Sequence, residues 1–308
     1  MSTVIQTNHL SKSYHGFQAV KDVSLSIKEG EIYGFIGLNG AGKTTVIRMI
    51  LGMVRPTHGA CYIHNQKVHL SNHHIWNQVG YIVETPHFYP ELTVKENLDI
   101  YRRLRLILDK NIVSKVMNQL NLTQYADKKA QNLSLGNAQR LGIAKALLPM
   151  PKVLILDEPV NGLDPAGIVE VRELLQDLAF NQGVTILISS HLLTEVAKIA
   201  TKIGIIDNGQ LVQEVETVNL NQLLHQYLLI HTKDNNVALS KLLSAGYVAK
   251  INDKGLIEIS DQAAIEHPDE VSRFLAYEGF PPMKLIVNEE DLEAYFFRTI
   301  TKKEEIVP

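Results

Sequence analysis

The segment that most constrains the fold is a glycine-rich loop that follows a short apolar run. Residues 37–44 read Gly-Leu-Asn-Gly-Ala-Gly-Lys-Thr and match the pattern G-x-x-x-x-G-K-[ST]. The apolar run at 32–36 predicts a strand before this loop, and the apolar residues within 46–50 predict a helix after it. In such a loop, main-chain N–H groups and the helix N-terminus surround phosphate oxygens. The sequence therefore predicts a strand–loop–helix unit that binds phosphate.

Further apolar runs predict that this strand belongs to a mainly parallel sheet. They are rich in β-branched residues, lack polar alternation, and cover residues 79–83, 153–156, 184–188 and 202–207. Helical patterns such as residues 170–180 lie between them, so the first two-thirds of the chain reads as α/β. Ligands of open parallel sheets bind beyond the carboxyl ends of the strands. The polar residues expected at this edge are Lys43, Thr44, Glu84, Asp157, Glu158 and His191.

The segment 85–150 predicts a helical insertion between two strands of this sheet. The first helical stretch of this segment begins at Thr93, with Glu96 three residues later, which is the pattern of a capping box. Helical patterns continue over 110–120 and 137–148.

The character of the chain changes again near residue 215. Strand and helix patterns alternate as β-α-β-β-α-β, which is the ferredoxin-like order, and a last helix is expected at about 289–300. A hairpin turn is expected at Asn252-Asp253-Lys254-Gly255. We therefore predict an α/β nucleotide-binding domain over residues 1–215 and a small α+β accessory domain over 216–308.

Composition limits where such a chain works. It has 308 residues, 30 Lys and Arg against 33 Asp and Glu, and one cysteine, Cys61. The near-neutral charge argues against binding nucleic acid by charge alone, and the single cysteine fits a reducing cytoplasm. No run approaches the 18 apolar residues of a membrane span, and the N-terminus lacks a signal-peptide pattern. A group of histidines near Cys61 matches no zinc-binding spacing. We expect a soluble, cytoplasmic protein.

The residues at the predicted sheet edge suit nucleoside triphosphate chemistry. Lys43 is expected to bridge the β- and γ-phosphates, and the Thr44 hydroxyl to ligate Mg²⁺. Asp157 follows an apolar strand downstream of the loop, where a second Mg²⁺ ligand is expected. Glu158 is then placed to act as general base toward the attacking water.

Residues 133–140, Leu-Ser-Leu-Gly-Asn-Ala-Gln-Arg, carry a family resemblance. The segment resembles the signature motif of ABC-type ATPases, usually written LSGGQ; Leu135 and Asn137 depart from that form, while Ser134 and Gly136 are retained. In that family the signature of one subunit completes the ATP site of the other. Ser134 is also expected to cap the following helix. The resemblance extends over roughly residues 2–215.

The resemblance implies roles for further residues. Tyr14 lies where the family places an aromatic ring that stacks on adenine, Asp164 lies in a loop at the subunit interface, and His191 is similar to a histidine that contacts the γ-phosphate. The implied ATP-binding residues are Tyr14, Gly37, Asn39, Gly40, Ala41, Gly42, Lys43, Thr44, Thr45, Ser134, Gly136 and Asp164. The implied catalytic residues are Glu158, His191 and Glu84.

Glu84 stands where the family normally has glutamine. A carboxylate can still coordinate Mg²⁺, so the expected metal ligands are Thr44, Asp157 and Glu84. The segment 80–93 resembles the ATPase subunits of bacitracin-resistance and lantibiotic self-protection exporters. The alternative is that Glu84 is a neutral variant of an ordinary transporter ATPase.

The resemblance implies an ATP-hydrolysing subunit of a bacterial ABC transporter that exports peptide antibiotics, with ATP and Mg²⁺ as cofactors. Expected partners are an integral-membrane permease and a second ATPase subunit, either a second copy in a nucleotide-dependent homodimer or a related chain. The chain is then peripheral to the inner face of the membrane and binds no nucleic acid. Alternatives are a transporter for another substrate, a soluble ABC ATPase acting on ribosomes or DNA, and a module that binds ATP without turnover.

Overall fold

The computed structural model describes residues 2–69 and 72–301, and these residues fall into two compact units. The first unit ends at Val218 and the second begins at Asn219. Each unit has its own hydrophobic core. None of the described helices has the length and hydropathy that a membrane span requires.

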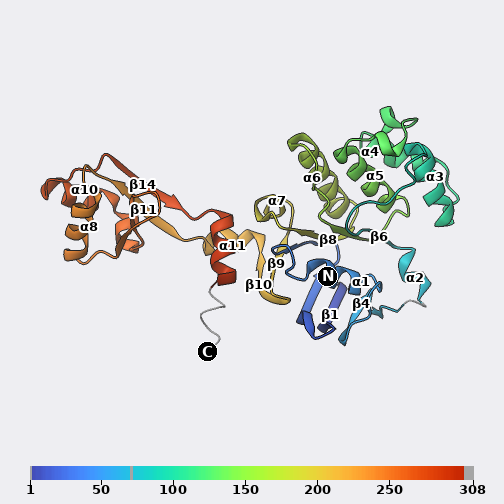
Figure 1. Ribbon diagram of the computed structural model, residues 1–308, viewed down its shortest axis with the longest axis horizontal. Coiled ribbons are helices and arrows are strands. Elements are labelled where there is room, and N and C mark those ends of the chain that lie inside the picture. The colour runs from blue at the N-terminus through green and yellow to red at the C-terminus, as the bar shows by residue number, and fades with distance from the viewer. Residues whose placement is uncertain (1, 70–71, 302–308) are drawn as a thin grey trace. The chain divides into compact units, whose positions relative to one another are not determined.

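The centre of the first unit is a six-stranded sheet with the order β10-β9-β3-β8-β7-β6 (Figure 1). Its strands are β3 (Ile32–Ile36), β6 (Val79–Ile82), β7 (Val153–Asp157), β8 (Thr185–Ser190), β9 (Lys202–Asp207) and β10 (Gln210–Glu216). Neighbouring strands run parallel except β9 and β10. Every residue of β3 and β7 is buried, which explains why their sequences lack alternation. The predicted parallel sheet is confirmed, and β10 adds an antiparallel edge to it.

A second sheet of the first unit has the order β2-β1-β4-β5 and is antiparallel. Its strands are β1 (Thr3–Tyr14), β2 (Phe17–Lys28), β4 (His58–Ile63) and β5 (Gln66–Lys67). The sequence patterns did not predict β1 and β2. The pairing of these two strands shifts register four times, and His9 and Asp22 have positive φ. These irregularities interrupt the period-two pattern by which a half-buried strand is recognised.

The helices of the first unit include the predicted insertion between β6 and β7. Outside the insertion lie α1 (Lys43–Ile50), α2 (His73–Trp76), α6 (Pro165–Phe180) and α7 (Leu193–Ala197). The insertion contains α3 (Val94–Leu104), α4 (Asn111–Gln119) and α5 (Leu135–Leu147), which lie together in Figure 1. The predicted capping box is confirmed: the Glu96 N–H donates to Thr93 Oγ1 at 3.2 Å, and the Thr93 N–H donates to Glu96 Oε2 at 2.8 Å.

The second unit has the predicted alternation of strands and helices. Its elements are β11 (Gln226–His231), α8 (Asn235–Ser244), β12 (Ala249–Ile251), β13 (Ile257–Ile259), α9 (Gln262–Glu266), α10 (Pro268–Tyr277), β14 (Lys284–Glu289) and α11 (Leu292–Thr301). The strands form one antiparallel sheet with the order β12-β13-β11-β14. The short helix α9 was not predicted. Residues 302–308 of the predicted second domain lie outside the described residues.

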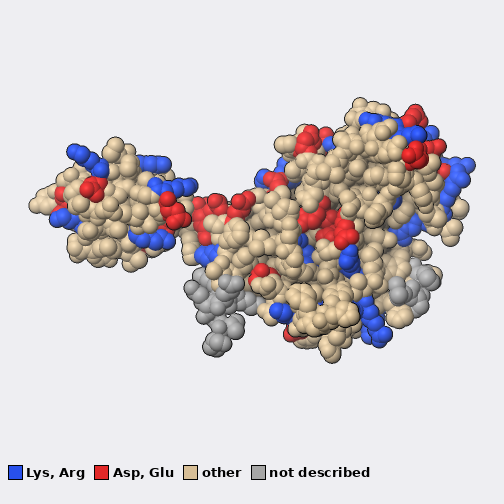
Figure 2. All heavy atoms as spheres, viewed as in Figure 1, with Lys and Arg blue, Asp and Glu red and all other residues tan. Residues whose placement is uncertain are grey.

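Acidic and basic side chains are interspersed over the face of the first unit that Figure 2 shows. This mixture agrees with the near balance of 30 Lys and Arg against 33 Asp and Glu along the chain.

Candidate nucleotide site

The glycine-rich loop joins β3 to α1, as the sequence predicted, and two of its glycines have little room for a side chain. A Cβ atom on Gly37 would lie 2.5 Å from the carbonyl oxygen of Ile206. One on Gly42 would lie 2.8 Å from the carbonyl oxygen of Ala19, and Gly42 also has a φ of +105°. Helix α1 begins at the next residue, Lys43. The main chain therefore turns at Gly42 directly into a helix N-terminus, the geometry that favours an anion.

The ammonium group of Lys43 is folded back along this loop. It donates to the carbonyl oxygens of Gly37 at 2.6 Å and Leu38 at 3.3 Å, and the side chain is only 6% exposed. The loop thus holds a buried cation beside the main-chain N–H groups that would contact phosphate.

The remaining predicted phosphate-loop residues differ in their exposure. Asn39 and Gly40 are exposed, Ala41 is buried, and Thr45 is half-buried on α1. The carbonyl oxygen of Ala41 accepts from the Gly209 N–H at 3.0 Å, which ties the loop to the turn between β9 and β10.

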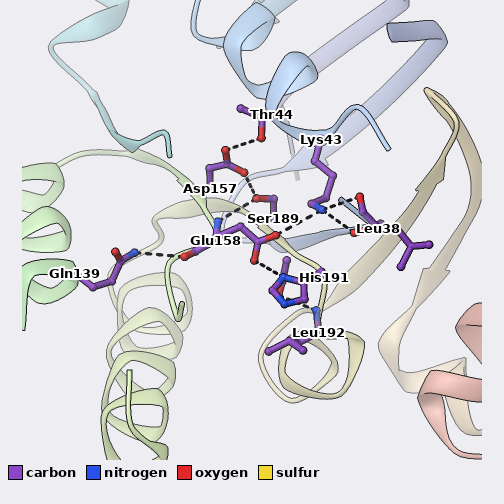
Figure 3. Close-up of polar contacts among 11 residues, drawn as sticks. Leu38, Lys43, Thr44, Gln139, Asp157, Glu158, Ser189, His191 and Leu192 are labelled. Carbon is purple, nitrogen blue, oxygen red and sulfur yellow. Dashed lines mark hydrogen bonds and ion pairs between the residues drawn. The ribbon is translucent and has the colours of Figure 1, made fainter. Parts of the chain in front are cut away.

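Asp157, the last residue of β7, connects the loop to the neighbouring strand. Thr44 Oγ1 donates to Asp157 Oδ2 at 2.9 Å, and Ser189 Oγ donates to Asp157 Oδ1 (Figure 3). The carboxylate is 2% exposed. Two of the three predicted metal ligands, Thr44 and Asp157, are therefore in direct contact.

Glu158 links the lysine of the loop to the predicted histidine. Its Oε1 lies 3.5 Å from Lys43 Nζ, and its Oε2 lies 2.9 Å from His191 Nδ1 (Figure 3). The main-chain N–H of Glu158 donates to Ser189 Oγ at 3.1 Å, and its carbonyl oxygen accepts from Gln139 Nε2 at 3.3 Å. Glu158 has a φ of +50°, a conformation that is uncommon outside glycine.

Glu84 lies after β6 and is turned toward α1. The pairing of Ile82 with Leu156 places the chain after β6 level with the chain after β7. Glu84 Oε1 nevertheless lies 2.5 Å from Arg48 Nη2 of α1, and Glu84 has a φ of +58°. The structure therefore pairs the third predicted metal ligand with an arginine rather than with the other two.

The predicted signature residues lie at the start of α5. The Ser134 hydroxyl accepts from the Asn137 N–H at 3.3 Å, so the predicted helix cap is confirmed. The side chain of Leu135, which departs from the usual signature, covers Gly162: a Cβ there would lie 2.4 Å from Leu135 Cδ2. Gly136 lies against the same turn, with the Gly162 carbonyl oxygen 3.4 Å from where its Cβ would be.

These signature residues line an open cavity of about 820 Å³. Its described lining includes Ser134, Gly136 and Asp164 but no residue of the 37–44 loop. Asp164 Oδ1 accepts from the Gly167 N–H at 3.0 Å and caps α6. Within one chain, then, the predicted nucleotide ligands form two separate groups.

Tyr14 belongs to neither group. It ends β1 and is 41% exposed, and the ammonium group of Lys12 lies 4.9 Å from its ring centroid.

Three residues of the site were not predicted from the sequence. Ser189 contacts both Asp157 and Glu158, Gln139 contacts Glu158, and Arg48 pairs with Glu84. For Ser189 a signal existed, because it directly follows the apolar run 184–188, at the edge where the parallel strands end. Gln139 and Arg48 lie on helices whose packing the sequence patterns do not describe.

Comparison with known proteins agrees with this geometry. The family model described as ABC transporter matches residues 20–161. The bacitracin transport ATP-binding protein of Bacillus licheniformis is 38% identical over 97% of this chain and 98% of its own length. The lantibiotic transport ATP-binding protein of Streptococcus pyogenes is 34% identical over 75% of this chain and all of its own length.

Solved structures show the same fold. A dimeric ATP-binding cassette, described in a post-hydrolysis state with ADP and phosphate, superposes with a TM-score of 0.65 at 25% identity. The match covers 69% of this chain and 98% of that chain. The glycine-rich loop lies beside two carboxylates at a strand end, and the relatives named above are transport ATP-binding proteins. These two observations lead to one assignment. The chain belongs to the ATP-hydrolysing, ATP-binding subunits of ABC transporters.

Proposed function

We propose that this chain powers the export of peptide antibiotics of the bacitracin or lantibiotic type through an integral-membrane permease. The observation that carries the proposal is the match to a bacitracin transport ATP-binding protein over 97% of this chain. The lantibiotic relative leaves a quarter of this chain unmatched, about the share that the second unit occupies. The length of the match therefore favours a bacitracin-type cargo.

ATP binds by its phosphates to the glycine loop. Main-chain N–H groups of residues 37–42 and the N-terminus of α1 surround the phosphate oxygens, and Lys43 donates to them in place of the carbonyl groups that it contacts now. Thr45, which lies two residues after Lys43 on α1, is a further residue of this phosphate-binding segment. Tyr14 supplies an exposed ring for the adenine.

Mg²⁺ suits the ligands that the site provides. The Thr44 hydroxyl and the Asp157 carboxylate are hard oxygen ligands in direct contact, and such ligands are preferred by this ion. When bound, Mg²⁺ polarises a phosphoryl oxygen as a Lewis acid. The Ser189 hydroxyl donates to Asp157 Oδ1, the carboxylate oxygen that Thr44 does not contact, and so keeps the carboxylate in place.

Glu158 acts on the attacking water. Its carboxylate takes the proton as general base, while His191 at Oε2 and Lys43 at Oε1 fix its orientation. His191 and Lys43 both carry N–H groups that can turn to the γ-phosphate, so one cluster orients the base and contacts the anion.

Two ATPase subunits complete each other's sites. Ser134 and Gly136 at the N-terminus of α5, with Asp164 nearby, present a hydroxyl and N–H groups to the nucleotide of a second subunit. The cavity that these residues line is separate from the glycine loop of their own chain, and a related cassette is described as dimeric. The second subunit is another copy or a related ATPase chain.

The permease docks beside the helical insertion, at the inner face of the membrane. A cavity of about 350 Å³ lies there between α1, the loop after β6 and α5, lined by Arg48, Glu84, Pro86, Tyr101 and Lys145 among others. The ammonium of Lys145 donates to the His87 carbonyl oxygen and lies 5.1 Å from the Tyr101 ring centroid, and burial lowers its pKa. Close to it, Leu104 at the end of α3 is 69% exposed. This partly apolar, cationic surface suits a cytoplasmic segment of a membrane protein.

The second unit, from about residue 216, is an accessory domain with ferredoxin-like topology. The β-α-β-β-α-β order and the strand order β12-β13-β11-β14 support this assignment.

Growth in the presence of antibiotics tests the proposed cargo. In a sensitive strain that produces this chain together with its permease, we expect resistance to bacitracin to rise, and Lys43→Ala to abolish the gain. The variant Glu84→Gln is expected to retain ATP hydrolysis but to change the resistance of the strain to the antibiotic. Unchanged sensitivity to both bacitracin and a lantibiotic would point to a transporter for another substrate.

A further inference from the structure

Arg48 and Glu84 line the cavity beside which the permease is proposed to dock, but the nucleotide chemistry proposed above gives their ion pair no role. Arg48 lies on α1, five residues after Lys43, and Glu84 lies in the loop after β6. Their side chains meet at 2.5 Å, with Arg48 37% exposed and Glu84 56% exposed. An exposed pair of this kind adds little to stability, so its position calls for another explanation.

The register of the sheet places the main chain at Glu84 beside the segment that carries two acidic residues, Asp157 and Glu158. Ile82 pairs with Leu156, so Glu84 follows its strand at the same level as Glu158 follows the neighbouring one. Neighbouring strands lie about 4.8 Å apart. Glu84 therefore adds a negative charge to the chain segment next to the one that carries Asp157 and Glu158, at a site that binds a polyanion.

We infer that Arg48 is a positioning residue for Glu84: it offsets the charge of Glu84 and holds its carboxylate at the α1 side of the nucleotide site. The inference rests on the proposed nucleotide site and on the expectation that Glu84 is one of the Mg²⁺ ligands there. It explains how an acidic residue is accommodated at this position. The Arg48–Glu84 pair as a whole carries no net charge, whereas Glu84 alone would repel the triphosphate.

Binding of a non-hydrolysable nucleotide separates this role from catalysis. Titration of the full chain with Mg²⁺ and AMP-PNP is expected to give a Kd for Arg48→Met about two- to five-fold above that of the unchanged chain. Arg48→Lys, which keeps the charge, should restore binding. Arg48→Met/Glu84→Gln, which removes both charges, should return the Kd to within about two-fold, since an exposed pair contributes no more than this range.

Three comparisons make the test specific. The Kd for ADP should change less than that for AMP-PNP, because ADP lacks the γ-phosphate. The effect of Arg48→Met should shrink at high salt, because both side chains are partly exposed. Arg273→Met, at an exposed arginine–aspartate pair with a distance of 2.6 Å in the second unit, should leave nucleotide binding unchanged.

The results that would overturn the inference are equally definite. If the double variant binds as weakly as Arg48→Met, Arg48 acts on the nucleotide directly and not through Glu84. Unchanged or tighter AMP-PNP binding by Arg48→Met, or an equal loss for ADP, would also refute it. If the chain without any substitution binds no AMP-PNP, that result would instead contradict the proposed nucleotide site itself.

Discussion

Glu158 is held through both its side chain and its main chain by four other residues. Lys43 and His191 hold its two carboxylate oxygens, and Ser189 and Gln139 hold its main chain. Because the main chain there has positive φ, these contacts keep a carboxylate in a conformation that glutamate rarely adopts. A group fixed in this way can accept a proton without first reorganising.

Glu158→Gln is expected to abolish steady-state ATP hydrolysis, with a loss of at least about 10²-fold, because an amide of the same size cannot accept the proton. Binding of ATP does not need that proton transfer, so ATP-bound dimers should persist. Phosphate release and light scattering with ATP measure the two effects.

The matched control is Glu214→Gln. Glu214 also accepts from a lysine, Lys202 at 2.9 Å, and from the hydroxyl of Tyr33 at 2.8 Å, but it lies on β10. Its substitution should leave turnover unchanged. Near-normal turnover in Glu158→Gln would remove Glu158 from the role of base.

At this scale the sequence indicated residue types but not their partners. Lys43, Thr44, Asp157 and His191 follow from motifs at the ends of apolar runs, because parallel strands end at one edge of a sheet. The contacts of Ser189 and Arg48 depend on strand register and on the rotation of α1. Neither quantity is contained in a motif.

The start of α5 depends on a turn far from it in sequence. Leu135 lies over Gly162, whose φ of +76° is in the left-handed region. A glycine at this turn serves two needs at once, since the conformation excludes most residues and the leucine leaves no space for a Cβ. Leu135, which departs from the usual signature, therefore packs at the start of α5 against the turn that contains Gly162.

Gly162→Ala is expected to lower the free energy of unfolding more than Gly183→Ala does. Gly183 has a φ of +70° with no atom within 4 Å of its Cβ position, so it reports the conformational cost alone, about 1 kcal/mol. At Gly162 the clash should force the exposed side chain of Leu135 off its preferred rotamer, which adds about 0.5–1.5 kcal/mol. Urea unfolding of both variants measures the difference; equal losses would show that Leu135 yields without cost.

Helices and strands could be predicted where the local sequence carries one clear pattern of apolar residues or a helix cap. The buried strands β3 and β7 and the capped start of α3 follow from local sequence. The long strands β1 and β2 do not, since their pairing slips four times and the alternation of polar and apolar residues is lost.

As a whole, the molecule joins a conserved type of ATPase fold to a second unit with its own core. The solved cassette covers 69% of the chain, whereas the bacitracin transport relative covers 97%. The cargo proposal therefore depends on the full chain, while ATP hydrolysis depends on the first unit. The strand and helix patterns of the sequence change in character near residue 215, and the structure divides into two compact units between residues 218 and 219.

The most direct test of this account is the ATPase rate of the chain assembled with its permease in lipid vesicles, measured with and without bacitracin. We predict that bacitracin raises the rate and that Glu158→Gln abolishes both the basal and the stimulated activity. A basal rate that depends on Glu158 but is unaffected by bacitracin and by a lantibiotic would contradict the proposed role in peptide-antibiotic export.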